Sequence, residues 1–257
     1  MYSELLLRPT ALQGQRIYPL DARRLVAKAT DGKGVSEAFF GRQVKRLAGK
    51  ENDGRFSMIP VIFDGGNGFI RIFGIGREGS DLLTEEMGKI VKSVASSLNC
   101  AVPVELRQGH HLRKNADRIV PYHIAKLALS KTGKNGNATM RKRYETFREA
   151  GNDIKKLEPM IKEIITNGIV QFAEDIDSEQ ADPSRITDNI PHDLVIKIHE
   201  GTPSISRIHP DSPGHAVIIR NLKFSMLGDL YGPWSVGHLR SHGCGLIKKL
   251  AGDRDRG

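Results

Sequence analysis

The sequence has little cysteine and tryptophan, no long apolar run, and no histidine before His110. No stretch of about 18 or more apolar residues occurs, and the N-terminus lacks a basic start followed by a long apolar segment. The sequence therefore predicts neither a membrane-spanning helix nor a signal peptide. Cys100 and Cys244 are expected to be buried small hydrophobic residues rather than a disulfide. We expect a cytoplasmic protein without redox chemistry.

Motifs for metal binding are also missing. Histidines that are close in sequence are His110 with His111, His192 with His199, and His238 with His242. No cysteine or carboxylate stands beside them at ligand spacing, and the glycine-rich chain from His238 to His242 is not expected to be helical. Paired catalytic carboxylates are equally absent, because most acidic residues fit helix caps or a solvated acidic segment. The sequence predicts no bound metal ion.

The segment "GIGREG" has the spacing of a dinucleotide-binding fingerprint, at Gly74, Gly76 and Gly79. However, the strand before it belongs to an expected hairpin rather than a βαβ unit. The next carboxylate beyond the following helix, Glu105, is 26 residues past Gly79 rather than about 20. Glycines that let a strand turn into a helix explain the segment better, so we expect no nicotinamide and no other cofactor.

The basic residues are concentrated in one part of the chain. Of the 257 residues, 39 are Lys or Arg and 30 are Asp or Glu, which gives a net charge of +9. Residues 107–166 contain 14 basic and 6 acidic residues, whereas residues 167–206 contain 2 and 8. A concentrated positive field favours a polyanion such as nucleic acid. A solvated basic surface without a ligand would give the same charge map, so charge alone leaves both interpretations open.

Residues 1–109 alternate between strand and helix patterns. Apolar spacing predicts a helix in "LDARRLVAKAT", with Asp21 as its cap, and a longer helix in "SDLLTEEMGKIVKSVASSLN". Strand patterns occur in "YSELLLRP", in two runs joined by a glycine-rich turn in "SMIPVIFDGGNGFIRIFGIG", and in "VPVELR". The order strand, helix, strand, strand, helix, strand predicts a ferredoxin-like domain over residues 1–109.

The pattern changes after residue 109. Polar and basic helical patterns around "VPYHIAKLALSK" and "TMRKRYETFREA" predict an α-helical basic insertion over residues 110–170, broken into short helices near Pro159. An acidic connector over residues 171–193 then leads to strand patterns. Residues 194–257 are therefore predicted to be mostly β.

The C-terminal segment "GHLRSHGCG", Gly237–Gly245, precedes the last expected strand, "CGLIKK". Glycine lets the backbone approach a ligand closely and turn its N–H groups outward, and Arg240 can hold a phosphate with two donors. A tight β-turn with incidental Arg and His side chains is the alternative interpretation. The ferredoxin-like start, the basic insertion and the following strand together favour a phosphate-binding loop.

This combination resembles a known family. A glycine, several variable residues that include a base, and Gly-x-Gly before the last strand are similar to the C-terminal loop of the RNA-processing endoribonucleases of CRISPR systems, in the superfamily of repeat-associated mysterious proteins. The basic insertion resembles the finger of the type IV enzyme. The resemblance spans both ends of the chain. It implies an α+β fold of two ferredoxin-like halves with a helical finger, and leaves open whether the second half is complete or degenerate.

The resemblance also implies a metal-independent RNA-cleavage site. Many members use a histidine near the first helix, a role that has no counterpart here because no histidine precedes His110. We therefore expect the catalytic residues to be Arg23, Arg24, Arg240 and His242. The predicted RNA-binding residues, in the finger and the C-terminal loop, are Arg113, Lys114, Arg118, Lys131, Lys134, Arg141, Lys142, Arg143, Arg148, Gly237, Ser241, Gly243, Gly245 and Lys248.

The function implied is cleavage of precursor CRISPR RNA at its repeat hairpin. The 2′-hydroxyl would attack the phosphate and leave a 2′,3′-cyclic phosphate, and the guide RNA would stay bound in an effector complex with other CRISPR-associated subunits. Bases at the foot of the stem are expected to stack on Tyr231 or Trp234. Two alternatives are a non-catalytic RNA-binding subunit of a CRISPR ribonucleoprotein and a ribosome-associated or other basic RNA-binding protein.

Overall fold

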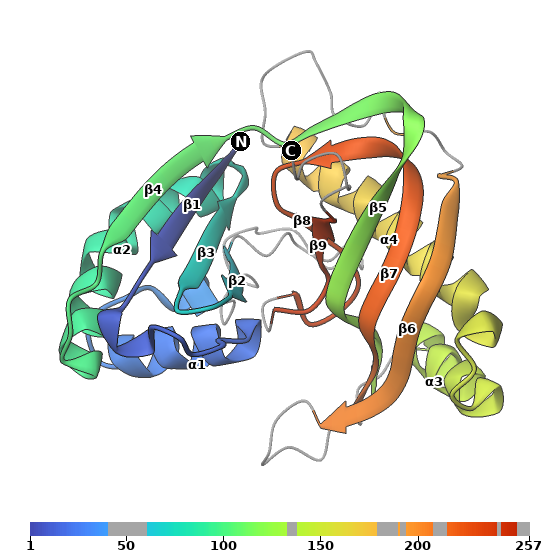
Figure 1. Cartoon of the computed structure of the whole chain (residues 1–257), viewed down its shortest axis with the longest axis horizontal. Helices are drawn as coiled ribbons and strands as arrows, with labels where there is room; N and C mark the ends of the chain where they lie inside the picture. Colours follow the sequence, from blue (N-terminus) through green and yellow to red (C-terminus); the bar gives the residue numbers. More distant parts are fainter. Residues whose placement is uncertain are drawn as a thin grey trace. The chain divides into compact units, whose positions relative to one another are not determined.

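The computed structural model describes residues 1–40, 61–132, 138–178, 190, 194–207, 215–240 and 243–250. The described chain forms two compact units, and the main boundary between them lies between His111 and Leu112. Each unit contains one antiparallel sheet and its own helices (Figure 1).

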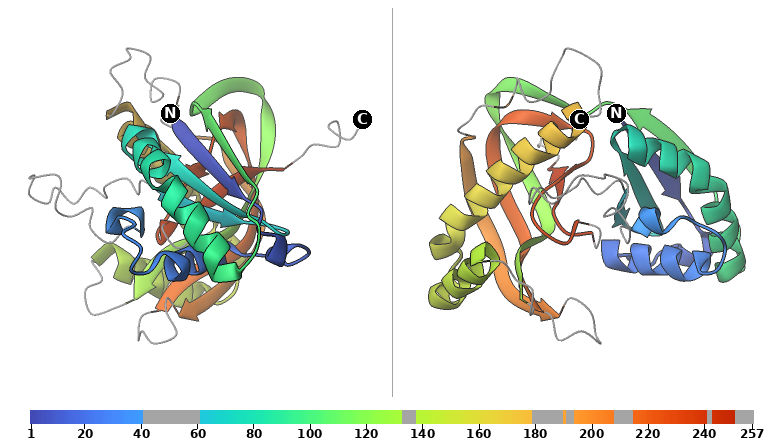
Figure 2. Two further views of the ribbon diagram at one scale, coloured as in Figure 1. Left: turned by 90° about the vertical axis from the view of Figure 1, so that its left-hand side faces the viewer. Right: turned by 180° about the vertical axis from the view of Figure 1, so that it is seen from behind.

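The first unit is a four-stranded sheet with two helices on one face (Figures 1 and 2). Its elements are β1 (Tyr2–Leu7), a 3-10 helix (Thr10–Leu12), α1 (Pro19–Thr30), a second 3-10 helix (Glu37–Phe40), β2 (Val61–Gly65), β3 (Ile70–Ile75), α2 (Gly76–Leu98) and β4 (Val104–Gly109). The strands lie in the order β2-β3-β1-β4, and neighbours are antiparallel. The predicted ferredoxin-like order of strands and helices is confirmed.

The apolar faces of α1 and α2 pack on this sheet and form its core. Ala22 and Val26 of α1 are fully buried, as their spacing predicts. Leu83, Ile90 and Val94 of α2 are fully buried on one stripe. They join a cluster with inward residues of β1, β2 and β3, and each buried aliphatic side chain contributes about 1.5–3 kcal/mol. This packing fixes the direction in which the polar side of α1 points.

The helix α1 begins with a proline rather than with an acidic cap. Pro19 occupies the first helical turn, and Tyr18 is the N-cap residue, without a capping hydrogen bond from its side chain. Proline is favoured there because its missing N–H would have no partner inside the helix. The prediction that Asp21 caps the helix is therefore wrong. Asp21 lies in the first turn, where its negative charge complements the helix dipole.

The "GIGREG" glycines serve the turn from β3 into α2. Gly76 has a φ of +69° and is the first residue of α2. A Cβ atom on Gly74 would collide with backbone atoms of Gly79 and Ser80. The strand and the helix therefore approach more closely than larger residues would allow, which is the structural explanation preferred from the sequence.

Residues 112–132 form one long strand, β5 (Leu112–Thr132), and not the expected helix. Val120, Tyr122 and Ile124 alternate on a buried face, and β5 pairs with β7 (His215–Tyr231) over most of its length. Over so short a segment, the apolar spacing in "VPYHIAKLALSK" is compatible with the 3.6-residue period of a helix and with the two-residue period of a strand. Pairing with β7 selects the strand. The prediction of a wholly helical segment over residues 110–170 is wrong for this part.

Two helices follow β5 in the second unit, α3 (Ala138–Ala150) and α4 (Ile154–Ser178). The helix α4 crosses one face of the second sheet and continues through Pro159, where a break was expected (Figures 1 and 2). Pro159 is tolerated because the helical hydrogen bond that it removes would end at Lys155, in the exposed first turn.

The start of the predicted acidic connector is helical, since α4 runs to Ser178. Most of the rest of residues 171–193 lies outside the described residues. The roles of α3 and α4 as an RNA-binding finger, and of residues 171–193 as a connector, stay predictions.

The second sheet has five strands in the order β6-β7-β5-β9-β8. The strands besides β5 and β7 are β6 (Ile196–Arg207), β8 (Trp234–Ser235) and β9 (Leu246–Lys249). If β5, β6, β7 and β9 are taken as the first to fourth strands, their order repeats that of the first sheet. The described residues after residue 193 form β6, β7, β8 and β9. The predicted α+β class with two ferredoxin-like halves is confirmed.

The two sheets differ in the connection from the third strand to the fourth. In the first unit this connection is α2, and in the second it is the glycine-rich chain from Gly232 to Gly245, which includes β8. No α-helix occurs among the described residues of that connection. As far as the structure describes it, the second half is therefore ferredoxin-like in its sheet but has a loop where the first unit has its second helix.

Candidate nucleic-acid interface

Arg23 and Arg24 are neighbours on α1 but differ in environment. Arg23 is half-buried, and its Nη2 donates a hydrogen bond to the carbonyl oxygen of Phe40 at 3.0 Å. Its guanidinium carbon lies 6.0 Å from the centroid of the Phe40 ring. Arg24 is exposed. Arg23 is thus held in place before any ligand binds, whereas Arg24 extends into solvent.

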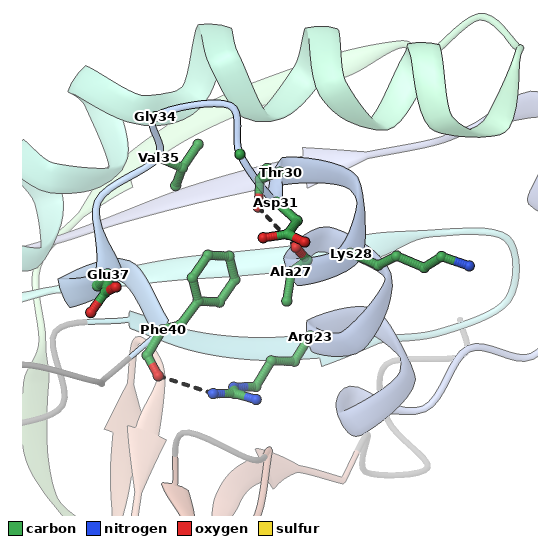
Figure 3. Close-up of a pocket in the computed structure, with 10 residues that line it drawn as sticks. Arg23, Ala27, Lys28, Thr30, Asp31, Gly34, Val35, Glu37 and Phe40 are labelled. Carbon is green, nitrogen blue, oxygen red and sulfur yellow. Dashed lines mark hydrogen bonds between the residues drawn. The ribbon is translucent and has the colours of Figure 1, made fainter.

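A pocket of about 550 Å³ lies beside Arg23 in the first unit (Figure 3). It is lined by α1 and the chain that follows it: Arg23, Ala27, Lys28, Thr30, Asp31, Gly32, Gly34, Val35, Glu37 and Phe40. Arg23 and Lys28 supply positive charge, while Asp31 and Glu37 supply negative charge. This mixture fits a polar group that both donates and accepts hydrogen bonds better than it fits a lone phosphate.

The glycine-rich loop of the second unit uses its glycines for backbone shape. Gly237 and Gly245 have φ values of +75° and +82°, in the left-handed region. A Cβ atom on Gly237 would press on the backbone of β5, and one on Gly245 would collide with the carbonyl of Val236. Leu239, which has a Cβ atom, has a φ of +58°. Such strained backbone is concentrated at functional sites, so it is consistent with a functional loop.

Several N–H groups of this loop are bonded within the second unit. The N–H of His238 donates to the carbonyl of Ala128 at 3.0 Å, and the N–H of Gly245 donates to that of Lys126 at 2.7 Å. The N–H of Val236 donates to the carbonyl of Gly245 at 3.0 Å. The expectation that the glycines turn backbone donors outward is therefore wrong for these three groups. Here the glycines let the loop approach β5 closely.

Arg143 of α3 connects the loop with α4. Its Nη1 lies 3.3 Å from Nε2 of His238, and its Nη2 donates to Oε1 of Glu163 at 3.2 Å. Because a guanidinium group only donates, Nε2 of His238 is the acceptor and the imidazole is neutral while this bond forms. From the sequence, His238 was considered only as a metal ligand, and its contact with Arg143 was missed. Its place beside Gly237 was the signal that could have identified it.

The other basic residues of α3 lie on its exposed side. Met140 and Phe147 are buried, whereas Arg141, Lys142 and Arg148 are exposed. Exposed cations on one helix can contact the phosphates of an RNA stem without reading its bases.

A second basic group crosses the second sheet. His123 of β5 pairs with Lys223 of β7 on one side and with Lys248 of β9 on the other. Burial lowers the pKa of His123, and the charges of Lys248 and Lys223 lower it further. His123 is therefore neutral at pH 7, and the lysines carry the charge of this group. The predicted residue Lys248 is half-buried here.

The two aromatic candidates for base stacking differ in exposure. Trp234 is 1% exposed, and its ring centroid lies 5.3 Å from that of Phe172 in α4. Its Nε1 donates to the carbonyl of Tyr231 at 2.9 Å. Tyr231 is 41% exposed. Trp234 is thus a core residue and not a stacking platform, while stacking on Tyr231 stays a prediction.

Some predicted residues lie outside the described part of the chain: Lys134, Ser241 and His242. Arg113, Lys114 and Lys131 belong to β5, but the structure does not describe their side chains. Arg118 is exposed, with Nη2 3.5 Å from Oδ2 of Asp229, and Gly243 has a φ of +76°. Arg240 is 9% exposed. The roles of these residues in RNA binding and catalysis stay predictions.

Within the described residues, no group of His, Cys, Asp and Glu side chains has the composition and spacing of a metal site. Nor does any described helix have the length and apolar character needed to cross a membrane. Cys100 and Cys244 are free, and burial raises the pKa of Cys244 to about 11, so this thiol stays protonated at neutral pH.

Comparison with known proteins identifies the family. Residues 3–252 match the family model described as the type IV CRISPR-associated endonuclease Csf5. A solved structure titled "Csf5, CRISPR-Cas type IV Cas6 crRNA endonuclease" is similar with a TM-score of 0.57 and 18% identity, over 98% of this chain and 100% of that chain. A crystal structure of Cas6b gives 0.55 and 15%, over 97% and 100%. No curated protein matches. Since the family match covers almost the entire chain, this protein belongs to the type IV CRISPR-associated Csf5 endonucleases.

Proposed function

We propose that this protein is a metal-independent endoribonuclease that binds the repeat hairpin of precursor CRISPR RNA in the cytoplasm and cuts beside it. The observation that carries the proposal is the family match over residues 3–252. The exposed cations of α3 and the fixed guanidinium of Arg23 support it. The mature guide RNA stays bound, and the protein becomes a subunit of an effector complex with other CRISPR-associated proteins.

In the proposed reaction the RNA supplies its own nucleophile. The 2′-hydroxyl beside the scissile phosphate loses its proton, and its oxygen attacks phosphorus in line. The bond from phosphorus to the 5′-oxygen breaks, and that oxygen takes up a proton. The products are a 2′,3′-cyclic phosphate and a 5′-hydroxyl. Arginines suit this chemistry, because they stay protonated and donate several hydrogen bonds to the charge that develops on the phosphate oxygens.

Arg23 is the best prepared of the proposed catalytic arginines. Its hydrogen bond to Phe40 holds the guanidinium, so little side-chain freedom is lost when a phosphate binds. Arg24 adds positive charge from an exposed position. Arg240 is largely enclosed, at 9% exposed, and acts from the strained loop.

His242 is the proposed residue for proton transfer, and His238 is a second candidate. While Arg143 donates to Nε2 of His238, that nitrogen cannot accept a proton from RNA. A phosphate that draws the guanidinium of Arg143 toward itself would release Nε2 to act as a base. Proton transfer by a positioned side chain contributes roughly 100- to 10,000-fold to rate. Single-turnover cleavage by His242→Ala and His238→Ala variants distinguishes the two.

The first experiment tests the mechanism. The protein is incubated with its cognate repeat RNA in chelator, alongside the same RNA with a deoxy sugar at the cut site. Cleavage is expected in chelator for the first RNA and is expected to be absent for the second, and the fragment upstream of the cut should end in a 2′,3′-cyclic phosphate. Cleavage that requires a divalent cation, or that survives removal of the 2′-hydroxyl, would contradict the mechanism. Tight binding without any cleavage would instead support the non-catalytic RNA-binding alternative.

The second experiment tests Arg23. Arg23→Ala is expected to lower the single-turnover cleavage rate roughly 100-fold while RNA binding changes little, because a donor to the reacting phosphate is lost. Lys28→Ala, an exposed cation on the same helix and pocket, is the matched control and should cut at nearly the normal rate. Thermal melting checks the fold, and Arg23→Lys is expected to recover part of the rate. Equal rate losses in Arg23→Ala and Lys28→Ala would show only a general charge effect.

A further inference from the structure

A cluster of charged and aromatic residues lies where β5, β7 and β9 come together in the second unit. Its centre is the carboxylate of Asp229, a residue that is 2% exposed. Nζ of Lys249 lies 2.6 Å from Oδ2 of Asp229, and Nη2 of Arg118 lies 3.5 Å from the same oxygen. The hydroxyl of Tyr122 donates to Oδ1 at 3.3 Å. One buried anion therefore holds two cations that are far apart in the sequence.

Asp229 keeps its charge despite its burial. Burial alone would raise the pKa of this carboxyl, but the hydrogen bond and charge of Lys249, with hydrogen bonds from Tyr231 and Tyr122, give a pKa below the ordinary value. The single negative charge leaves the two cations with a net positive charge. Both reach solvent, since the side chains of Arg118 and Lys249 are 70% and 41% exposed.

An exposed aromatic ring stands beside these cations. Nζ of Lys249 lies 5.8 Å from the centroid of the Tyr231 ring. The backbone of Tyr231 is fixed, because its carbonyl accepts the hydrogen bond from Trp234, which is buried against Phe172. The backbone that carries the ring is therefore ordered before a ligand binds, and Asp229 holds both cations near it.

We infer that this cluster binds one nucleotide of single-stranded RNA outside the cleavage site, with the base stacked on Tyr231 and the phosphate held by Arg118 and Lys249. The inference rests on the proposed function for RNA as the ligand. A base needs an exposed ring on which to stack, and a phosphate needs hydrogen-bond donors nearby. The guanidinium of Arg118 has five N–H donors, so donors remain for a phosphate after its contact with Asp229. Asp229 is a positioning residue and does not contact RNA.

The test uses the full-length protein and two probes, a short adenosine oligoribonucleotide and an abasic oligoribophosphate of the same length. Tyr231→Leu is expected to weaken binding of the adenosine probe about tenfold and to leave binding of the abasic probe unchanged, because stacking requires a base. Tyr231→Phe keeps the ring and loses only one hydrogen bond to Asp229, so it should bind both probes nearly as well as the wild type. Fluorescence anisotropy at one salt concentration measures the affinities, and circular dichroism verifies the fold.

A lysine pair provides the matched control for the phosphate contact. Lys249→Ala is expected to weaken binding of both probes, and more so than Lys223→Ala. Nζ of Lys223 also lies 2.6 Å from a carboxylate oxygen, that of Glu200, but the side chain of Glu200 is 55% exposed, whereas that of Asp229 is 3% exposed.

Three results with the variants would overturn the inference: equal losses in the two lysine variants, a Tyr231→Leu variant that binds the adenosine probe like the wild type, or a Tyr231→Phe variant as weak as Tyr231→Leu. Wild-type protein that binds neither probe would also overturn it. If the protein shows these effects on binding but cuts no repeat RNA, the proposed cleavage fails and this site stands. If it cuts repeat RNA and Tyr231 has no effect, this site fails alone.

Discussion

The two sheets share one strand order but connect their third and fourth strands differently. In the first unit β3 leads into α2, which bonds its own backbone groups and buries one apolar stripe. In the second unit β7 leads into the glycine-rich loop, whose N–H groups find partners on β5 and within the loop. Most backbone N–H and C=O groups of a helix are hydrogen-bonded within the helix, whereas those of a loop need hydrogen-bond partners on neighbouring segments. Two of the candidate site residues, His238 and Arg240, therefore lie in a loop where the first unit has a helix, and loops commonly carry functional residues.

The missing helix is partly replaced by α4. Phe172 of α4 packs on Trp234, and a Cβ atom on Gly168 of α4 would collide with Val236 at the start of the loop. The helix that follows the first strand of the second sheet therefore supports the loop as well. This explains why α4 is long and apolar on one side.

The largest expected effect is the difference in stability between two glycine-to-alanine variants, one in each of the two connections. Gly245→Ala is expected to lower the free energy of unfolding by more than about 2 kcal/mol, because its φ is +82° and the new Cβ atom would collide with Val236. Gly88→Ala, in the exposed part of α2 with nothing within 4 Å, is expected to raise it by about 0.5–1 kcal/mol. Chemical denaturation measures both changes. Similar changes in the two variants would contradict the contrast between loop and helix.

An intermediate effect is expected from Asp229, which joins three strands of the second sheet. Asp229→Asn should lower the free energy of unfolding at neutral pH by about 1–3 kcal/mol, because it weakens bonds to Lys249 and Tyr122. The folded state lowers the pKa of Asp229, so its stabilisation is present above the ordinary carboxyl pKa of about 3.9 and is lost as the pH falls through the lower folded value.

Denaturation measured from neutral pH downward tests this second prediction. The wild type should lose its advantage over Asp229→Asn below a pH of about 4. Glu200→Gln is the control, since Glu200 forms an exposed ion pair with Lys223, and it should change stability by less than about 1 kcal/mol. A stability difference between the wild type and Asp229→Asn that does not shrink in acid would show that the charge of Asp229 is not the cause.

The smallest expected effect compares basic residues on helices of the two units. Replacing Arg141, Lys142 and Arg148 of α3 by glutamine should weaken binding of repeat RNA about tenfold and reduce its salt dependence by a slope of about 2 to 3, since three phosphate contacts are lost. The matched variant replaces Arg77, Lys89 and Lys92 on the exposed side of α2 and should change both quantities less. Affinity measured at several salt concentrations tests this. Equal losses would mean that RNA binding depends on total charge rather than on α3.

The first unit was more predictable from the sequence than the second for a physical reason. In α2, the apolar residues Leu83, Ile90 and Val94 follow the 3.6-residue period of a helix, so the helix can be predicted from neighbouring residues alone. In β5, the choice between helix and strand depended on pairing with β7, which lies about a hundred residues further along the chain. In the candidate site, too, local features could be predicted and contacts between distant segments could not. The exposed cations of α3 could be predicted from composition, whereas the contact between Arg143 and His238 could not.

The sequence by itself determined the ferredoxin-like first half, the concentration of positive charge and the glycine-rich loop, because each is written in neighbouring residues. Only the tertiary structure decided that β5 is a strand, that three of the loop's N–H groups are already bonded, and that Asp229 holds Arg118 and Lys249 beside Tyr231. These features depend on which strands pair and on the register in which they pair. Pairing between distant segments is set by the burial of the whole core and not by any short stretch of sequence.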